Sequence, residues 1–457
     1  MQEYFIELSK YLITICMALY AFECFHVFRY RKESERHGIY VRQNVLMFVI
    51  QLLCYLNLIL VSKDLEYLFY YLFVQVFLVA ALVMAGVIYE KINRLLLNNM
   101  CMLLSIGFCM IARLSFNKGL RQYVIALASL AGSLLIPYLM YKMTFLRKMT
   151  WVYAAVGILL LSIVLILGEV TYGSKRAFTV GGFTLQPSEF VKIIFIFFLA
   201  GALKEEPSFK RVALTTLLSG IQVVILVASK DLGSALIFFI GFIALVFIAT
   251  RNYWYLLAGV IGGCVAAYAS YLLFAHVRVR VLAWRDPWTY IDNEGYQITQ
   301  SLFAIGNGSW FGTGLMQGNP KAIPFVDADF MFSAICEELG VIFGVCLILV
   351  CLSCFVVIMD ISVRLKDKFY QLTAYGLGVI YIFQVFLTIG GGIKFIPLTG
   401  ITLPLVSYGG SSILTTMVMF FVVQGLYMKL QQEGDKKLDR KSSKAAKESK
   451  ERPEKQS

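Results

Sequence analysis

The chain has few charged residues: Asp, Glu, Lys and Arg make up only 15% of its 457 positions, whereas hydrophobic residues make up 59%. Soluble domains carry about 25% charged residues, so this deficit excludes a large soluble catalytic domain. The mean hydropathy is +0.74, and Phe and Tyr number 36 and 26. We therefore expect an all-α polytopic membrane protein.

Histidine is also scarce, and the three residues present, His26, His37 and His276, are too scattered to form a set of metal ligands. The sequence lacks a Walker-type phosphate loop and a zinc-binding helix motif, which excludes nucleotide hydrolysis as the source of energy. Ten cysteines are present, but each falls within an expected span, where it acts as a small apolar side chain. No nucleic-acid partner is expected.

Long apolar runs determine the expected architecture. Runs of about 20 residues match a hydrocarbon core of roughly 30 Å, and on this basis the sequence predicts thirteen membrane spans. Three extra N-terminal transmembrane helices are expected within residues 1–95, a ten-helix membrane core at 96–429 and a disordered, basic cytoplasmic tail at 430–457. The expected spans are 9–27, 44–62, 67–88, 96–114, 121–141, 151–169, 189–203, 211–228, 233–250, 252–274, 331–359, 370–390 and 409–429.

The distribution of positive charge predicts the orientation of the chain. Cytoplasmic loops of membrane proteins retain Lys and Arg. If the first residue lies outside, 27 of the 41 Lys and Arg residues fall in inner loops or in the tail. We therefore expect the N-terminus outside and the C-terminus in the cytoplasm.

Four polar insertions then share the outer face. One follows the sixth span, with Gln186-Pro187-Ser188-Glu189, and a second is Lys230-Asp231-Leu232-Gly233-Ser234. The third is the long loop 275–330, which leads into Glu337-Glu338-Leu339-Gly340. The fourth, from Ile396 to Ser412, contains two prolines that interrupt the apolar chain. Non-helical backbone at membrane depth occurs only where protein or a wet cavity satisfies its polar groups, so this run is expected to line a site.

These motifs resemble those of the SEDS family (shape, elongation, division and sporulation; the RodA, FtsW and SpoVE group). They occur in the same order, together with Gly295-Tyr296-Gln297 and Asp329-Phe330, over about residues 96–429. The resemblance implies a peptidoglycan glycosyltransferase of the bacterial cytoplasmic membrane, which polymerises lipid II at the extracytoplasmic face. It also implies a class B penicillin-binding protein as transpeptidase partner.

The resemblance places the essential acid at Asp329, the expected general base. The substrate is a glycan on an undecaprenyl diphosphate, so the leaving group is already activated and only one proton must be removed from the attacking hydroxyl. A base works best with a pKa near ambient pH, and partial burial and the nearby Asp327 are expected to raise that of Asp329. Outer cations are expected to stabilise the diphosphate. The expected substrate-binding residues are Arg176, Glu189, Lys192, Lys230, Asp231, Arg280, Gln297, Gln300, Lys394, Ser407 and Ser411.

Two other functions remain open from the sequence. A lipid II flippase would need polar sites on both faces, yet the inner loops hold mainly orientation charges. A non-catalytic cell-wall scaffold would recruit partners without synthesis. No cofactor is demanded by ligand spacing, although a divalent cation, Mg²⁺ or Mn²⁺, held by outer carboxylates is an alternative.

Overall fold

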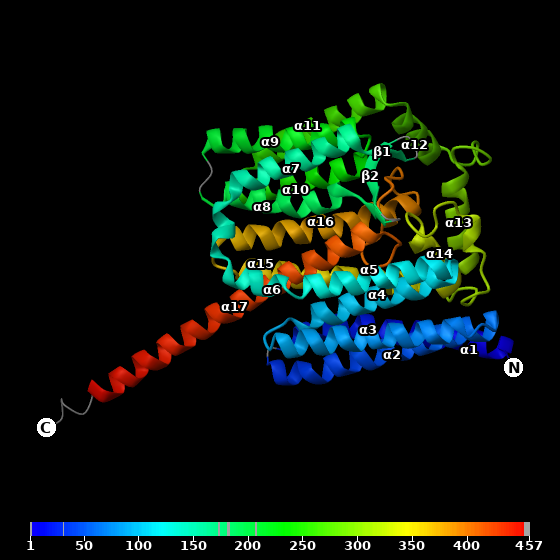
Figure 1. The fold of residues 1–457 in the computed structure, drawn as a ribbon, viewed down its shortest axis with the longest axis horizontal. Coiled ribbons are helices and arrows are strands. Elements are labelled where there is room, and N and C mark those ends of the chain that lie inside the picture. Colours follow the sequence, from blue (N-terminus) through cyan, green and yellow to red (C-terminus); the bar gives the residue numbers. More distant parts are fainter. Residues whose placement is uncertain (1, 31, 172–173, 181–182, 206–207, 452–457) are drawn as a thin grey trace.

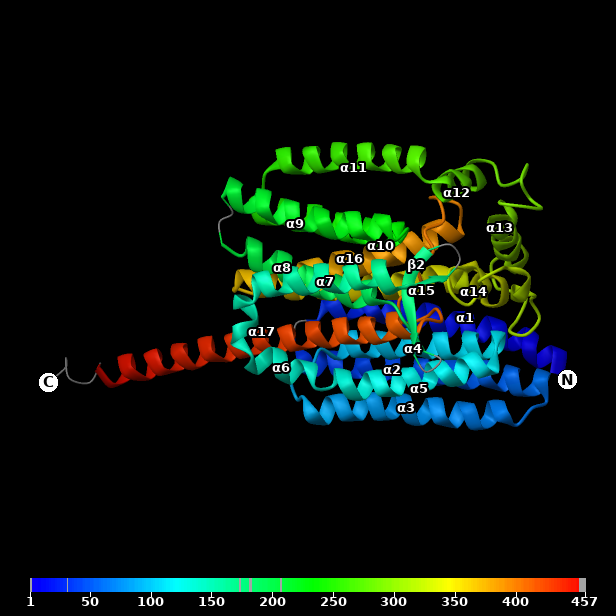
Figure 2. The same ribbon diagram turned by 45° about the horizontal axis from the view of Figure 1, so that its top comes forward.

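The computed structural model describes residues 2–451 except 31, 172–173, 181–182 and 206–207. Long helices lie side by side in one bundle, and α17 runs through it and extends beyond the end opposite the start of α1 (Figure 1). We call the end that carries the strands, α12, α13 and α14 the loop end; residues 2–6 lie at the same end (Figures 1 and 2). The helices are α1 (Gln2–His26), α2 (Glu33–Ser62), α3 (Glu66–Ile88), α4 (Arg94–Leu114), α5 (Phe116–Ser133), α6 (Ile136–Lys142), α7 (Thr150–Leu167), α8 (Pro187–Leu203), α9 (Phe209–Ala228), α10 (Leu232–Thr250), α11 (Tyr253–Leu273), α12 (Ala275–Arg285), α13 (Tyr296–Gly308), α14 (Met331–Leu339), α15 (Val341–Arg364), α16 (Lys368–Gly392) and α17 (Gly410–Glu451), with 3₁₀ turns at Val27–Arg29, Thr144–Lys148 and Pro320–Ala322.

The all-α polytopic fold is confirmed, because twelve helices among the described residues are long and apolar enough to cross a membrane. Thirteen spans are predicted, one more than this number. The remaining one, 189–203, is α8, a helix of only 17 residues. Helices α7, α9, α10, α16 and α17 pack around it. Because protein and not lipid surrounds α8, its length does not have to match the bilayer.

Two predicted spans are broken in the structure. The span 121–141 becomes α5 and α6, and Pro137 near the start of α6 explains the break, since proline has no N–H and clashes with the carbonyl four residues before it, here that of Ser133. The span 331–359 divides at Gly340, which has φ 92° and ψ 161°. Glu337, Glu338 and Cys336 therefore lie on the short α14, outside the spanning helix α15, which corrects the prediction for all three.

Helix α4 lies at the centre of the bundle. All of its membrane-spanning window is buried, and α2, α3, α5, α15 and α17 contact it. Asn98 and Asn99 on this helix need polar partners, which the surrounding helices provide. Helices α1, α2 and α3 contact the rest of the protein mainly through α4 and α15, with smaller contacts to α5 and α14.

Three short strands lie in the loop between α7 and α8: β1 (Glu169–Thr171), β2 (Ser174–Val180) and β3 (Phe183–Leu185). Both neighbouring pairs are antiparallel, in the order β1-β2-β3. They form a small ribbon at the loop end (Figure 2).

The disorder expected from residue 430 stays a prediction. In the structure, the backbone of α17 is helical as far as Glu451. Lys, Glu and Ala, which are strong helix formers, dominate this segment and explain the extended helix.

Replacing Gly340 with alanine should destabilise the protein. Its backbone conformation is restricted to glycine, and a Cβ there would lie 2.4 Å from the Trp310 carbonyl oxygen. We expect a loss of about 1–3 kcal/mol from backbone strain alone, seen as a lower midpoint of thermal unfolding in detergent. Gly262→Ala on α11 is the control, because no atom lies within 4 Å of a Cβ at that position. Equal unfolding midpoints for the two variants would contradict this explanation.

Candidate functional site

Residues 393–409 join α16 to α17 without forming a helix. Side chains from neighbouring helices satisfy the carbonyl groups of this segment. Gln384 Nε2 donates to the Thr402 carbonyl (3.1 Å), and Thr388 Oγ1 donates to the Ile401 carbonyl (2.9 Å). Gln122 Nε2, on α5, donates to the carbonyl of Ser407 (3.3 Å). The unwound segment is thus held by polar side chains, as its sequence predicts.

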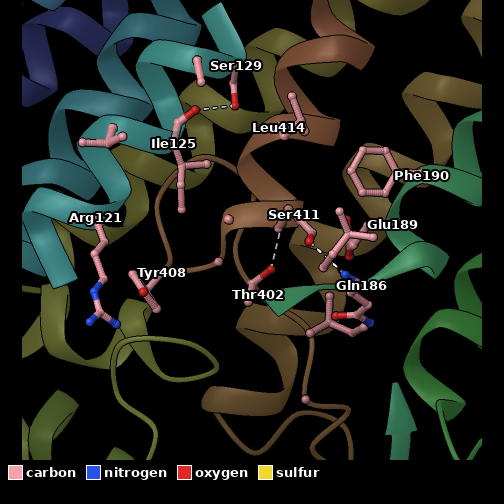
Figure 3. A pocket seen from close by; sticks show the side chains of 18 residues that line it. Arg121, Ile125, Ser129, Gln186, Glu189, Phe190, Thr402, Tyr408, Ser411 and Leu414 are labelled. Carbon is pink, nitrogen blue, oxygen red and sulfur yellow. Dashed lines mark hydrogen bonds between the residues drawn. The ribbon is translucent and has the colours of Figure 1, made fainter. Parts of the chain in front are cut away.

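A cavity of about 510 Å³ lies beside this segment, between α5, α8 and the start of α17 (Figure 3). Residues 400–402 and 408–412 of the proline-containing run line this cavity, and its role as a functional site stays a prediction. Apolar and polar side chains share its lining. The apolar lining residues are Val124, Ile125, Ala128, Leu185, Phe190, Ile401 and Leu414; the others are Arg121, Ser129, Gln186, Glu189, Gly400, Thr402, Tyr408, Gly409, Gly410, Ser411 and Ser412.

One of the apolar lining residues lies on the membrane-facing surface of the bundle. Val124 lies within a membrane-spanning segment and is 54% exposed. Arg121 and Tyr408 lie together on one side of the cavity, and Gln186 lies on the other (Figure 3). Such a cavity suits an amphipathic ligand, whose apolar part stays in the bilayer while its polar part meets hydrogen-bonding groups.

Glu189, one of the polar lining residues, forms a buried ion pair within α8. Lys192 Nζ lies 2.5 Å from Glu189 Oε2 and donates to Gln384 Oε1 at 2.8 Å. Thr415 Oγ1 on α17 donates to the same glutamate oxygen (3.1 Å). Buried charges are tolerated when they are paired and hydrogen-bonded in this way. Two predicted site residues, Glu189 and Lys192, are thus brought together, and Glu189 also lines the cavity.

Asp231 forms the N-cap of α10. Its carboxylate accepts hydrogen bonds from the Ser234 amide (3.3 Å) and hydroxyl (2.8 Å), from the Ser188 hydroxyl (3.2 Å) and from Gln186 Nε2 (3.2 Å). The backbone N–H of Gln186 donates to Ser411 Oγ (2.9 Å), a contact dashed in Figure 3. Asp231 is therefore joined to the cavity through its neighbours, as a cap that holds the start of α8 against α10.

Asp329 lies in the turn that precedes α14. The turn begins at Phe325, whose φ is 57°, and the Asp329 amide donates to the Phe325 carbonyl (3.1 Å). The Asp329 side chain is half-buried and does not line the cavity. The same turn is tied to the cavity wall, because the amide of Tyr408 donates to the Asp327 carbonyl (2.7 Å).

The carboxylate of Asp327 forms an ion pair with Lys118 of α5, with 2.6 Å between Nζ and Oδ2. The ammonium group of Lys118 also lies 5.5 Å from the ring centre of Tyr408. The negative charge expected to act on Asp329 is therefore paired with a positive one.

The two glutamates of the Glu-Glu-Leu-Gly motif hold the long loop. Glu338 Oε1 lies 2.8 Å from Arg113 Nη2, and Glu337 Oε1 accepts from the Asn319 amide (3.0 Å). Burial raises the pKa of Glu338 to about 7, although the neighbouring Arg113 opposes that shift. Both carboxylates therefore have structural partners that hold the loop in place.

Other predicted residues surround the loop end without lining the cavity. Arg280 Nη1 donates to the Thr399 carbonyl (3.2 Å), and the carbonyl of Lys394 accepts from Trp284 Nε1 (3.1 Å). Both contacts dock α12 onto the unwound segment. Ser407 is buried, and its hydroxyl accepts from the Leu403 amide (3.1 Å), which folds that segment back on itself.

The structure does not bring the remaining predicted residues to the cavity. Gln297 and Gln300 lie on α13, both half-buried, and neither lines it. Lys230 is exposed beside Asp231, with a φ of 61°. Arg176 lies in β2, and its side chain is outside the described part of the chain.

Sequence reasoning missed three residues near the site: Lys118, Arg121 and Tyr408. Lys118 and Arg121 are one helical turn apart, and both precede or open the predicted span 121–141 on its outer side. Two cations at the mouth of a span were a usable signal. Tyr408 lies within the proline-containing run, but nothing in its own sequence context indicates that it faces α5.

A helical bundle with a cavity lined by both apolar and polar side chains, beside an exposed residue of a membrane-spanning segment, defines a polytopic membrane protein able to receive an amphipathic molecule from the bilayer. The FtsW/RodA/SpoVE model, described as "Cell cycle protein", matches residues 92–432. The chain belongs to this family.

Curated relatives agree with the family assignment. The chain is 32% identical to the peptidoglycan glycosyltransferase RodA of Mycobacterium leprae over 355 residues, 72% of this chain and 76% of that protein. It is 36% identical to a probable peptidoglycan glycosyltransferase FtsW of Aliivibrio salmonicida over 58% of this chain and 68% of the relative. The match to RodA of Mycobacterium tuberculosis spans 57% of that relative, at 35% identity. The expected enzyme class, a glycosyltransferase, is confirmed by these relatives.

Solved structures show the same fold. One, from a study of "Structural coordination of polymerization and crosslinking by a peptidoglycan synthase complex", has a TM-score of 0.64 at 26% identity, and the match covers 75% of this chain and 100% of the other. The crystal structure of the rod shape determining protein RodA of Thermus thermophilus has a TM-score of 0.57 at 24% identity, over 74% of this chain and 97% of that one. The second likeness concerns the fold alone.

Separating the structural and functional roles of the α8 ion pair requires two variants. Lys192→Met leaves Glu189 buried without its cation, which typically costs about 3–5 kcal/mol. The double variant Glu189→Gln/Lys192→Met removes both charges and should recover most of that stability, measured as the midpoint of thermal unfolding. We expect glycan synthesis to stay low in the double variant, because the cavity has lost its acidic lining. Full recovery of synthesis would show that the pair is purely structural.

Proposed function

We propose that this protein polymerises lipid II into the glycan strands of peptidoglycan at the outer face of the bacterial cytoplasmic membrane. The observation that carries this proposal is the amphipathic cavity, which meets lipid on one side and touches the Asp329 turn on the other through Tyr408. The apolar lining residues suit an undecaprenyl chain, and the polar lining residues suit a diphosphate-linked sugar.

The proposed reaction needs one base and one charge stabiliser. Asp329 takes the proton from the attacking sugar hydroxyl, whose oxygen forms a bond to the anomeric carbon of the donor. The bond between that carbon and the diphosphate oxygen breaks, and its electron pair leaves with the undecaprenyl diphosphate. No nucleotide is consumed, because the diphosphate is already an activated leaving group.

Arg121 is the cation best placed for the departing diphosphate. It lines the cavity, is exposed, and has no carboxylate partner among the described side chains. Arginine binds phosphate oxygens with two parallel hydrogen bonds. Lys192 and Arg280, by contrast, are already engaged with Glu189 and with the Thr399 carbonyl.

The proposed orientation follows from the positive-inside rule. The loop end, which carries Asp329 and the N-terminus, would face outward, and the opposite end, with the basic C-terminal helix, would face the cytoplasm. One structural relative comes from a complex that coordinates polymerisation with crosslinking. We therefore propose that this chain also works beside a crosslinking partner, a class B penicillin-binding protein.

The requirement for a divalent cation is a separate proposal. The described residues contain no group of three His, Cys, Asp or Glu side chains able to hold a metal. A Mg²⁺ or Mn²⁺ ion would then be carried mainly by the substrate's diphosphate. Titration with EDTA during synthesis from purified lipid II, followed by adding back each metal, tests this requirement.

Asp329→Asn should abolish glycan synthesis while the protein stays folded in the membrane. The amide is isosteric with the acid but cannot accept the proton, so we expect a loss of at least about 100-fold in rate. The measurement is polymerisation of labelled lipid II by purified protein, with unfolding temperature as the check on folding. Asp292→Asn is the matched control, because it changes an exposed acid of the same long loop that lies outside the Asp329 turn. We expect it to retain most of the activity, and normal synthesis by Asp329→Asn would reject the proposed base.

The same preparation distinguishes the two other functions. A flippase would move labelled lipid II across liposomes without making polymer. A scaffold would make no polymer in vitro, and every substitution at the loop end would be silent in that assay. Polymer made by the wild-type protein and lost in Asp329→Asn supports the polymerase alone.

A further inference from the structure

Helices α1, α2 and α3 are an addition to the family fold. The family model begins at residue 92, and the match to one solved relative covers all of that chain but only 75% of this one. We call these three helices the N-terminal module. Its role is assigned by neither the family model nor the relatives.

Buried hydrogen bonds join the module to α4 within the membrane. Asn99 Oδ1 accepts from the Tyr20 hydroxyl and from Cys24 Sγ, both at 3.2 Å. Asn98 Nδ2 donates to Gln43 Oε1 (3.1 Å) and to the Tyr40 carbonyl (3.3 Å). Helices in lipid gain little from the hydrophobic effect, so such polar contacts and close packing set how they dock. The module therefore has a defined position on α4.

Helix α3 reaches the short turn between α4 and α5 at the loop end. The Tyr70 hydroxyl donates to the Gly119 carbonyl (3.1 Å), and that of Tyr67 donates to the Ala112 carbonyl (3.4 Å). Phe116, between these two acceptors, lies edge-on to both tyrosine rings, with centroid distances of 5.3 and 5.8 Å. Both ends of the turn are thus held by the module.

Two cations lie on either side of this turn and hold the Asp329 region. Arg113 binds Glu338 of α14, with its Nε at 3.0 Å and its Nη2 at 2.8 Å from Oε1. Lys118 pairs with Asp327 at 2.6 Å, two residues before Asp329. The cations therefore engage the chain on both sides of the proposed base, one before it and one after it.

Helix α1 touches the same region from another side. The rings of Tyr11 and Phe311 are 5.1 Å apart, and Ile6 lies against Gly314. The Gly314 amide donates to the Glu338 carbonyl (3.0 Å), at the end of α14. Two elements of the module are thus linked to the short helix that follows Asp329, α3 through Arg113 and α1 through the Gly314 segment.

We propose that the N-terminal module is a built-in brace that positions Asp329 for the reaction, with Tyr67 and Tyr70 as positioning residues. The inference rests on the proposed function of Asp329. The turn between α4 and α5 transmits the position of α3 to the acid through Arg113 and Lys118. The module therefore acts on turnover and not on the binding of the lipid substrate, because it does not line the cavity.

The double variant Tyr67→Phe/Tyr70→Phe removes both hydroxyl groups and keeps the ring packing. We expect kcat for polymerisation of purified lipid II to fall about 3- to 30-fold with KM within twofold of the wild type, because a displaced catalytic group lowers the rate without weakening binding. Hydrogen exchange of residues 311–340 should become faster. Tyr71→Phe on the same helix is the control, since its ring contacts that of Tyr55 in a tilted arrangement and, among the described residues, its hydroxyl makes no hydrogen bond to the turn. Unchanged kcat in the double variant would overturn the brace.

A crosslink separates a fixed brace from a moving one. In a Cys264→Ser background, which removes the exposed native thiol, Tyr11→Cys and Phe311→Cys are joined with a short thiol-specific crosslinker. A fixed brace predicts that kcat stays within twofold after crosslinking, and a loss of turnover would overturn it. Asp329→Asn run in parallel distinguishes the two failures. If that variant is inactive while the tyrosine variant is normal, only the brace is rejected; if it is active, the proposed base is rejected.

Discussion

The unwound backbone between α16 and α17 must satisfy its carbonyl and amide groups inside a bundle that excludes bulk water, and the site depends on how it does so. Gln384, Thr388 and Gln122 supply the hydrogen bonds from three positions on α16 and α5. With those groups occupied, the segment can leave helical geometry and form one side of a cavity. The cavity is therefore a consequence of side-chain hydrogen bonding by helices that are otherwise apolar.

The buried charges follow the same logic. Glu189 and Lys192 pair within one helix, whereas Glu338 and Arg113 pair across 225 residues of chain. Removing a charge from water is costly, so each ion specifies the position of its partner. At the loop end these pairs, together with Lys118 and Asp327, define where the turn containing Asp329 lies.

The sequence was sufficient for features that depend on local pattern. Apolar runs predict the helices, and prolines predict where the unwound segment lies. The two glutamates at 337 and 338 signal a buried polar element, but only the structure shows that Arg113 is the partner of Glu338. Such pairings depend on how distant helices pack, which one sequence does not encode by spacing. For the same reason Arg121 was missed, while the predicted substrate-binding residue Gln297 does not line the cavity.

The enclosed position of α4 has a consequence for biogenesis. Asn98 and Asn99 on this helix find their partners in α1, α2 and α15. During synthesis, α1 and α2 enter the membrane before α4 and offer it acceptors and donors at once, while Ser353 of α15 arrives much later. A truncated chain beginning at α4 would leave Asn98 facing lipid, where an unpaired amide is costly. The first two helices therefore shield the buried amides of α4 from lipid.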